Sequence, residues 1–137
     1  MFLIDTDILS ALRKRQRNPH VVRWMLNQRM TDLYLSVVSL GEIERGITRQ
    51  QHRDPTFARV LAAWLDSVLS LYHTRILDVD LPTARRWGRL SATLGHEGAD
   101  LLIAATALEH GLTVVTRNVR DFEPTGVTVL DPSVSQG

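Results

Sequence analysis

Residues 1–9 read MFLIDTDIL, and the interpretation of the whole chain begins with this segment. Four apolar residues, Met1 to Ile4, predict a short buried strand. Asp5 follows this strand directly, and Asp7 lies two positions further on. An ionised carboxylate beside a protein core is unfavourable unless it has a partner. The segment therefore predicts a core strand whose carboxyl end carries polar chemistry.

Length and composition restrict the class of protein. The 137 residues predict one domain over residues 1–132, followed by a short C-terminal tail at 133–137. The chain has no cysteine, so disulfides and thiolate metal sites are excluded. No apolar run approaches the roughly 20 residues of a membrane span, and the N-terminus lacks the pattern of a signal peptide. We therefore expect a cytoplasmic protein without a membrane anchor.

Strand and helix patterns alternate along the chain. Strands are predicted at 1–5, 33–38, 75–79, 113–116 and 127–130. Helices are predicted at 7–14, 19–29, 39–50, from 55 onward, at 82–94 and at 99–110, two of them with cap-and-proline starts at Asn18-Pro19 and Asp54-Pro55. This alternation predicts an α/β fold with a parallel sheet covered by helices on both faces. Ligands bind at the carboxyl ends of the strands in such sheets.

Acidic residues are predicted at this edge of the sheet. Asp5 ends the first strand, Glu42 lies in the first turn of the helix after the second strand, and Asp121 follows the fourth strand. Asp100 begins the helix at 99–110, which is apolar on nearly every side and is therefore predicted to be buried. Because a buried carboxylate needs partners, Asp100 joins the other three as a candidate site residue.

Each acidic residue also has a purely structural interpretation. Asp5 and Asp7 are typical helix N-caps, and the helix dipole favours Asp100 near a helix N-terminus. Ser39 and Glu42 have the spacing of a capping box, S-x-x-E, which taken alone makes capping the more common role for such a glutamate. Asp121 could be an ordinary loop residue.

Taken together, four converging carboxylates would repel one another and raise their own pKa values. A bound divalent cation removes this repulsion, and oxygen ligands without cysteine or histidine suit Mg²⁺ or Mn²⁺ rather than zinc. Water bound to such an ion can attack a phosphodiester. The five histidines show no metal-ligand spacing, and the H-E-x-x-H motif of zinc proteases is absent from the sequence.

Four segments of the chain also have a characteristic order. They are MFLIDTDIL (1–9), SLGEIERG (39–46), GADLLIAATALEHGLTVVTRNVRDF (98–122) and TGVTVLDP (125–132). Together they resemble the PIN-domain ribonucleases, and among these the VapC-type (FitB-like) toxins of bacterial toxin–antitoxin pairs. The resemblance implies a three-layer α/β/α PIN-like fold with a short parallel sheet of four to five strands. It also implies an acidic pocket that binds Mg²⁺ or Mn²⁺.

The acidic positions of the family correspond here to Asp5, Glu42, Asp100 and Asp121. The resemblance makes Asp5 and Asp100 the expected direct metal ligands, with the other two completing the metal-binding and catalytic set.

Four neighbouring residues are expected close to the metal. Many family members carry asparagine where this chain has Asp7, so Asp7 either adds metal affinity or caps a helix. Asn118 stands where some members carry an aspartate, and Asp121 either takes that role or flanks it. Thr6 and Thr116 are placed at strand ends, where their hydroxyls could orient the catalytic aspartate of the first strand.

We therefore expect a metal-dependent endoribonuclease that cleaves RNA with a metal-activated water, with Glu42 or Asp121 as general base. The resemblance further implies a small VapB-like antitoxin, and a homodimer or a toxin–antitoxin hetero-oligomer. The net charge of +1 does not by itself indicate a nucleic-acid-binding protein. Candidates for contacts with flanking phosphates are Arg13, Arg15, Arg17 and Arg117. The run RKRQR (13–17) is, however, also typical of a solvated helix end.

Two alternatives remain open at this stage. A non-catalytic binding module would use the acidic edge of the sheet for a basic partner. A strand that ends in Asp-x-Asp also resembles the haloacid-dehalogenase phosphatases, in which the first aspartate is the nucleophile and the second an acid. That mechanism needs a lysine later in the chain, and Lys14, the only lysine, lies in the wrong half, so the phosphatase is disfavoured.

Overall fold

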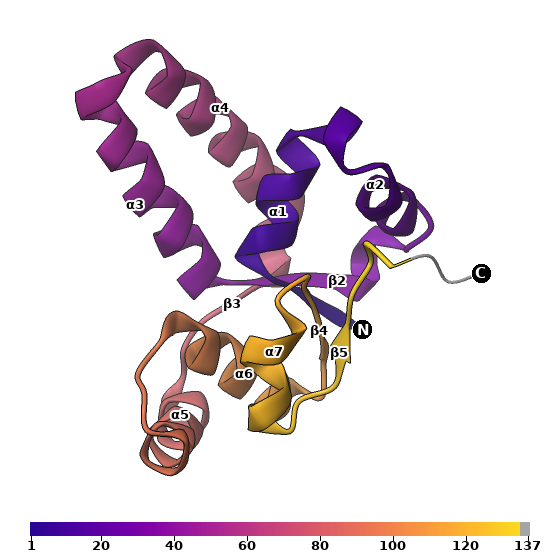
Figure 1. The fold of residues 1–137 in the computed structure, drawn as a ribbon, viewed down its shortest axis with the longest axis vertical. Coiled ribbons are helices and arrows are strands. Elements are labelled where there is room, and N and C mark those ends of the chain that lie inside the picture. The colour runs from indigo at the N-terminus through magenta and orange to yellow at the C-terminus, as the bar shows by residue number, and fades with distance from the viewer. Residues whose placement is uncertain (135–137) are drawn as a thin grey trace.

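Five short parallel strands form one sheet in the computed structural model, which describes residues 1–134 (Figure 1). The strands lie in the order β3-β2-β1-β4-β5, so β1 is at the centre. Their bounds are β1 Phe2–Ile4, β2 Leu33–Ser36, β3 Ile76–Leu77, β4 Thr113–Val115 and β5 Val129–Leu130. The predicted α/β fold with a short parallel sheet is confirmed.

The helices of residues 1–134 cover both faces of this sheet. Their bounds are α1 Thr6–Arg13, α2 Pro19–Leu26, α3 Val37–Arg53, α4 Pro55–Tyr72, α5 Leu81–Leu94, α6 Ala99–His110 and α7 Val119–Phe122. In Figure 1, α1 to α4 lie on one side of the sheet and α5 to α7 on the other. The predicted three-layer α/β/α arrangement is therefore present.

Two apolar clusters, one on each face of the sheet, form the core. Successive residues of a strand point to opposite faces. Leu3 accordingly packs with α6 and Phe122, whereas Ile4 packs with α1 to α4, and both β1 residues are fully buried. Val114 and Val115 repeat this alternation in β4. A central strand that is apolar on both faces explains why the chain begins with a continuous apolar run.

The direction of winding reverses between β1 and β4. The chain runs outward from β1 through β2 to β3, and then returns to place β4 and β5 on the other side of β1. Ligands in open α/β sheets bind at the carboxyl ends of the strands where the order reverses. Here the residues that follow these two strands are Asp5 and Thr116. The topology thus brings two of the predicted site residues to one edge of the sheet.

The start of α3 differs from the prediction. The helix begins at Val37 rather than Ser39, because the Ser36 hydroxyl accepts the Val38 backbone N–H at 3.1 Å and caps the helix. The predicted capping box of Ser39 and Glu42 is therefore wrong. Glu42 lies in the second turn of α3, not the first, and is not needed to cap it.

The second correction concerns Asn18. Its side chain gives α2 no cap and instead donates to the carbonyl groups of Ala11 and Lys14, at 3.2 and 3.0 Å, at the end of α1. Asp54 does cap α4 as predicted, and accepts the Phe57 backbone N–H at 3.1 Å. Asparagine before proline therefore marks the helix boundary correctly here but serves the preceding helix.

None of the helices in the described part of the chain is both long enough and apolar enough to cross a membrane. Of the predicted tail at 133–137, residues 135–137 lie outside the described residues. The predicted domain boundary at residue 132 remains a prediction.

Candidate active site

Asp5 lies at the carboxyl end of β1, and only 3% of its surface is exposed. One carboxylate oxygen accepts the Thr6 backbone N–H at 2.8 Å, and the other accepts the Thr116 hydroxyl at 2.8 Å. The first bond is the predicted N-cap of α1. The second bond joins residues that are 111 positions apart. Donors from both sides of the sheet's reversal point therefore fix the Asp5 side chain.

Burial raises the pKa of the Asp5 carboxyl to about 6. The hydrogen bonds from Thr116 and Thr6 oppose this shift, whereas the nearby carboxylates of Asp100 and Asp7 reinforce it. None of the ion pairs within residues 1–134 includes Asp5. The ionised carboxylate consequently has neutral donors but no compensating positive charge.

Asp100 reaches the same region from the first turn of α6, whose body is buried as predicted. Burial raises the pKa of Asp100, and the carboxylates of Asp121 and Glu42 raise it further, while His96 lowers it. Since Asp100 also raises the pKa of Asp5, its carboxylate is within electrostatic reach of the three other predicted acidic residues.

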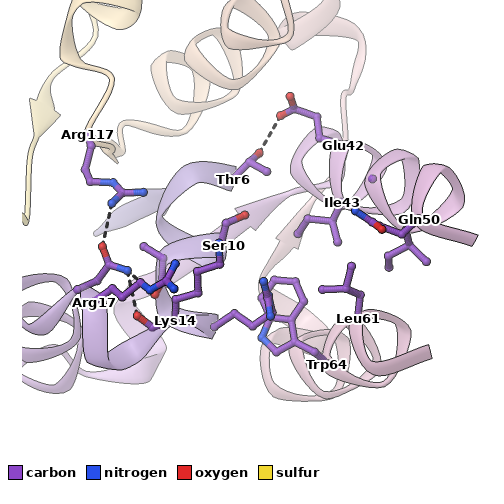
Figure 2. Close-up of a pocket in the computed structure, with 15 residues that line it drawn as sticks. Thr6, Ser10, Lys14, Arg17, Glu42, Ile43, Gln50, Leu61, Trp64 and Arg117 are labelled. Atoms are coloured by element: carbon purple, nitrogen blue, oxygen red, sulfur yellow. Dashed lines mark hydrogen bonds between the residues drawn. The ribbon is translucent and has the colours of Figure 1, made fainter. Parts of the chain in front are cut away.

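A chain of hydroxyl groups holds Glu42. The Thr6 hydroxyl lies 2.7 Å from Glu42 Oε1 and 2.9 Å from the hydroxyl of the fully buried Ser39. Figure 2 marks the hydrogen bond between Thr6 and Glu42. A hydroxyl carries one proton and a carboxylate carries none, so Thr6 donates to Glu42 and accepts from Ser39. Thr6 thus binds Glu42 through its side chain and Asp5 only through its backbone N–H. The expected hydroxyl contact from Thr6 to the first aspartate is not formed.

Thr116 makes that expected contact. Its fully buried hydroxyl donates to Asp5 and accepts the Asn118 backbone N–H at 2.9 Å. Asn118 therefore supports the site through its main chain. Asp121 is exposed and lies in the single turn of α7, on the segment that follows β4.

Asp7 has the charged partner that Asp5 lacks. Arg117 Nη2 and Nε donate to Asp7 Oδ1 and Oδ2 at 2.6 and 3.0 Å, and the Arg117 backbone N–H adds a bond to Oδ2 at 3.1 Å. Arg117 Nη1 also donates to Asn18 Oδ1 at 2.9 Å. Such forked arginine–carboxylate pairs are geometrically specific. Asp7 is therefore an ion-pair residue in this structure rather than the cap of α1.

The four predicted acidic residues approach one another without forming a closed metal site. Within residues 1–134, no three acidic or histidine side chains are placed so that they could hold one metal ion together as they stand. Their chemistry nevertheless fits a hard divalent cation, because the donors are carboxylate oxygens whose repulsion such an ion would remove. The raised pKa values of Asp5 and Asp100 support this fit.

A groove of about 580 Å³ opens beside the acidic residues, between α1, α3 and α4 (Figure 2). Glu42 is the acidic residue of its lining, with Thr6 beside it, so the groove adjoins the site at Glu42 rather than at the buried Asp5. Its basic lining residues are Arg13, Lys14, Arg17 and Arg117. An acidic site and a basic groove therefore share one boundary.

Two features of the site are missing from the sequence prediction. The capping-box interpretation hides the role of Ser39 as the hydroxyl partner of Thr6, and its position three residues before Glu42 on one helix face is the only available indication. The pairing of Arg117 with Asp7 has no local indication at all, because 110 positions separate the two residues.

Comparison with known proteins identifies relatives of this chain. A family model described as PIN domain matches residues 2–126. Toxin FitB of Neisseria gonorrhoeae is 35% identical, over 96% of this chain and 98% of its own length. The VapC ribonuclease Y4jK of Sinorhizobium fredii is 32% identical, over 96% of this chain and 97% of its own length. The solved structure of FitAB bound to the IR36 DNA fragment matches with a TM-score of 0.87 and 32% identity, over 100% of this chain and 99% of that chain.

Proposed function

Because this chain belongs to the PIN-domain family, we propose that it is a metal-dependent endoribonuclease and the toxin of a type II toxin–antitoxin pair. The chain is homologous to FitB and VapC proteins over nearly its full length. A relative named as a ribonuclease supports the reaction class. The proposed substrate is single-stranded or looped RNA.

The observation that carries this proposal is the buried carboxylate of Asp5. It has a raised pKa of about 6, two neutral donors and, within residues 1–134, no ion-pair partner. Strongly shifted carboxylates cluster at functional sites, where the shift serves the chemistry. We propose Asp5 and Asp100 as direct metal ligands, with Glu42 and Asp121 as the other acidic residues of the site.

Mg²⁺ or Mn²⁺ is the proposed cofactor, since the acidic site offers oxygen donors. When bound, such an ion polarises a phosphodiester and lowers the pKa of an attacking water. Thr116 holds the Asp5 carboxylate in one orientation through its hydroxyl. Thr6 binds Oε1 of Glu42, which leaves Oε2 to orient a water and accept its proton. Asp121 is the alternative residue for that role.

The proposed partner is a small VapB-like antitoxin, in a toxin–antitoxin hetero-oligomer or with a toxin homodimer at its centre. The relative named Toxin FitB and the matched FitAB structure support such a pair. The acidic site would also accept an arginine from an antitoxin, so the binding-module alternative is compatible with the toxin function. An RNA substrate would place the activity in the cytoplasm.

Membership of the PIN-domain family argues against the alternative that the chain is a phosphatase. The arrangement of Asp7 agrees with this, because the residue that would act as the acid of a phosphatase is held in a forked ion pair by Arg117.

The direct test is incubation of the purified protein with total cellular RNA, with and without Mn²⁺, followed by mapping of the cut ends. Cleavage at defined positions that requires the metal is expected. Asp100→Asn should lower the cleavage rate more than roughly 100-fold, because loss of a direct ligand exceeds the 10- to 100-fold effect of losing an outer partner.

Asp66→Asn is the matched control, since Asp66 is an exposed aspartate of α4 away from the site. It should cleave RNA like the unmodified protein. Circular dichroism establishes that both variants are folded. Unchanged metal-dependent cleavage by folded Asp100→Asn would overturn the proposal.

A further inference from the structure

We infer that the groove between α1, α3 and α4 binds the phosphate backbone of single-stranded RNA on one side of the cleavage site. The inference rests on the proposed function, because it extends the substrate from Glu42 into the groove. Figure 2 shows Thr6 and Glu42 at one end of the groove, and Lys14, Arg17 and Arg117 along its wall. The ligand class is therefore a polyanion that passes from the acidic site onto basic side chains.

The basic wall is largely unpaired inside the protein. None of the ion pairs within residues 1–134 includes Arg13, Lys14 or Arg17. Arg13 lies over the Phe57 ring at 5.2 Å, a contact that leaves its charge uncompensated by any carboxylate. Lys14 and Arg17 are exposed. Unpaired cations on a concave surface raise the local concentration of phosphates.

Hydrogen bonds at the end of α1 hold the main chain that carries these cations. The Asn18 side chain donates to the carbonyl groups of Ala11 and Lys14, and its oxygen accepts Arg117 Nη1. The basic segment 13–17 is therefore tied to the arginine that binds Asp7 beside the acidic site. A merely solvated helix end would not need this second attachment.

The opposite wall belongs to α3. Glu42, Gly46 and Gln50 are spaced four residues apart, so they share one helix face, and all three line the groove. Eight residues of α-helix span about 12 Å, so this wall is long enough to follow a short stretch of RNA backbone. A Cβ at Gly46 would meet nothing within 4 Å, so the middle of this path is open.

Trp64 and Leu61 of α4 give the groove an apolar surface next to the cations. Aromatic side chains beside basic residues are typical of single-strand binding, because every nucleobase has a face that stacks. Bases inside a double helix are not available for this contact. The combination therefore favours unpaired RNA over duplex RNA, and a polyanion over an apolar peptide.

The first experiment measures binding of a labelled, mixed-sequence RNA strand of about 12 nucleotides by fluorescence anisotropy, in EDTA so that metal-dependent cleavage does not interfere. The double variant Lys14→Gln/Arg17→Gln should reduce the slope of log K against log salt by about 1.4, since each lost phosphate contact removes about 0.7 for a single strand. This corresponds to about 25-fold weaker binding in 0.1 M salt if the affinities converge at 1 M.

The matched control is Arg85→Gln/Arg89→Gln, which removes the same charge from exposed positions of α5 on the other side of the sheet. Its salt slope should equal that of the unmodified protein. An equal reduction in both double variants would overturn the inference, because binding would then depend on net charge rather than on the groove.

A second experiment fills the groove without removing charge. Gly46→Trp should weaken RNA binding and raise KM for metal-dependent cleavage more than it lowers kcat. Gly88→Trp is the remote control, because a Cβ there also meets nothing within 4 Å and Gly88 lies on α5. RNA binding by Gly46→Trp equal to that of Gly88→Trp would overturn the inference.

The outcomes separate this inference from the proposed function. An unmodified protein that never cleaves RNA refutes the proposed function. A protein that cleaves RNA, and whose groove variants bind and cleave like the unmodified chain, refutes only the groove. If the groove variants lose binding of a labelled poly-glutamate peptide but keep RNA binding, the groove serves an acidic protein partner and the inference is wrong.

Discussion

Asp5 and Asp7 stand two positions apart after the same strand, yet their surroundings are opposite. Asp7 shares its charge with Arg117 through two short bonds of a forked pair, and 21% of its side chain is exposed. Asp5 is 3% exposed and has two neutral donors, with no ion-pair partner in residues 1–134. The compensated carboxylate forms an ion pair within the protein, and the uncompensated one is the proposed metal ligand.

The difference follows from the direction that each side chain takes. Asp5 ends the central strand and faces the buried Thr116 hydroxyl of the adjacent strand end. Asp7 already belongs to α1 and reaches the exposed Arg117 on the loop that follows β4. An Asp-x-Asp sequence therefore does not define a pair of equivalent ligands.

Asp5→Asn removes the negative charge of the uncompensated carboxylate and should have the largest effect on RNA cleavage. We expect metal-dependent RNA cleavage to fall more than roughly 100-fold, because the loss of a direct ligand exceeds that of an outer partner. The fold should persist, since an amide oxygen can still accept one of the two hydrogen bonds. The kcat/KM for a labelled RNA measures the effect, and activity within tenfold of the unmodified protein would contradict the role of Asp5.

The pH dependence of folding stability tests the difference between Asp5 and Asp7 without any RNA substrate. The pKa of Asp5 rises from its ordinary value of 3.8 to about 6, so the folded state binds this proton more tightly than the unfolded state. The resulting stabilisation is complete below about pH 4 and is lost as pH rises through about 6, which amounts to about 3 kcal/mol for this one group.

Urea unfolding in EDTA between pH 4 and 7 measures this loss. The variant Asp5→Asn should show a flatter profile than the unmodified protein, and addition of Mn²⁺ at pH 7 should restore stability to the unmodified protein only. Identical profiles for the two proteins would show that folding does not raise the pKa of the Asp5 carboxyl as expected.

Asp7→Asn should have the smallest effect. The ion pair is partly exposed, so its loss should lower the free energy of unfolding by about 1 kcal/mol or less. Cleavage activity should change less than roughly tenfold, the lower end for a residue that acts through other groups. A double-mutant cycle with Arg117→Gln measures the coupling between the two side chains. A loss of activity as large as that of Asp5→Asn would place Asp7 among the metal ligands.

The order of the strands and helices could be predicted from the sequence, and so could the edge of the sheet that carries the acidic residues. An apolar run followed by aspartate, and alternating strand and helix patterns, are enough to predict Asp5 at a strand end in a parallel sheet. The start of α3 was not accessible in the same way. Ser36 and Ser39 both fit a cap, and Val37 and Val38, being β-branched, resemble a continued strand. Val38 instead packs against the core from the first turn of the helix.

The long-range contacts of the site could not be predicted from the sequence. The Thr116 hydroxyl on Asp5 and the Arg117 fork on Asp7 join positions more than a hundred residues apart. Such contacts depend on strand register, which here aligns Ile4 with Val115. Only the packing of the whole sheet decides which of the two aspartates pairs with an arginine and which accepts a hydrogen bond from a threonine hydroxyl.

The pairing of β1 with β4 also sets an order of events during synthesis. Phe2 pairs with Thr113, so the middle of the sheet stays open until almost the entire polypeptide has left the ribosome. Distant pairings of this kind slow folding. A nascent chain that stops short of residue 116 carries Asp5 without the hydroxyl that orients it. We therefore expect unfinished copies of the protein to be much less active as nucleases than the finished chain.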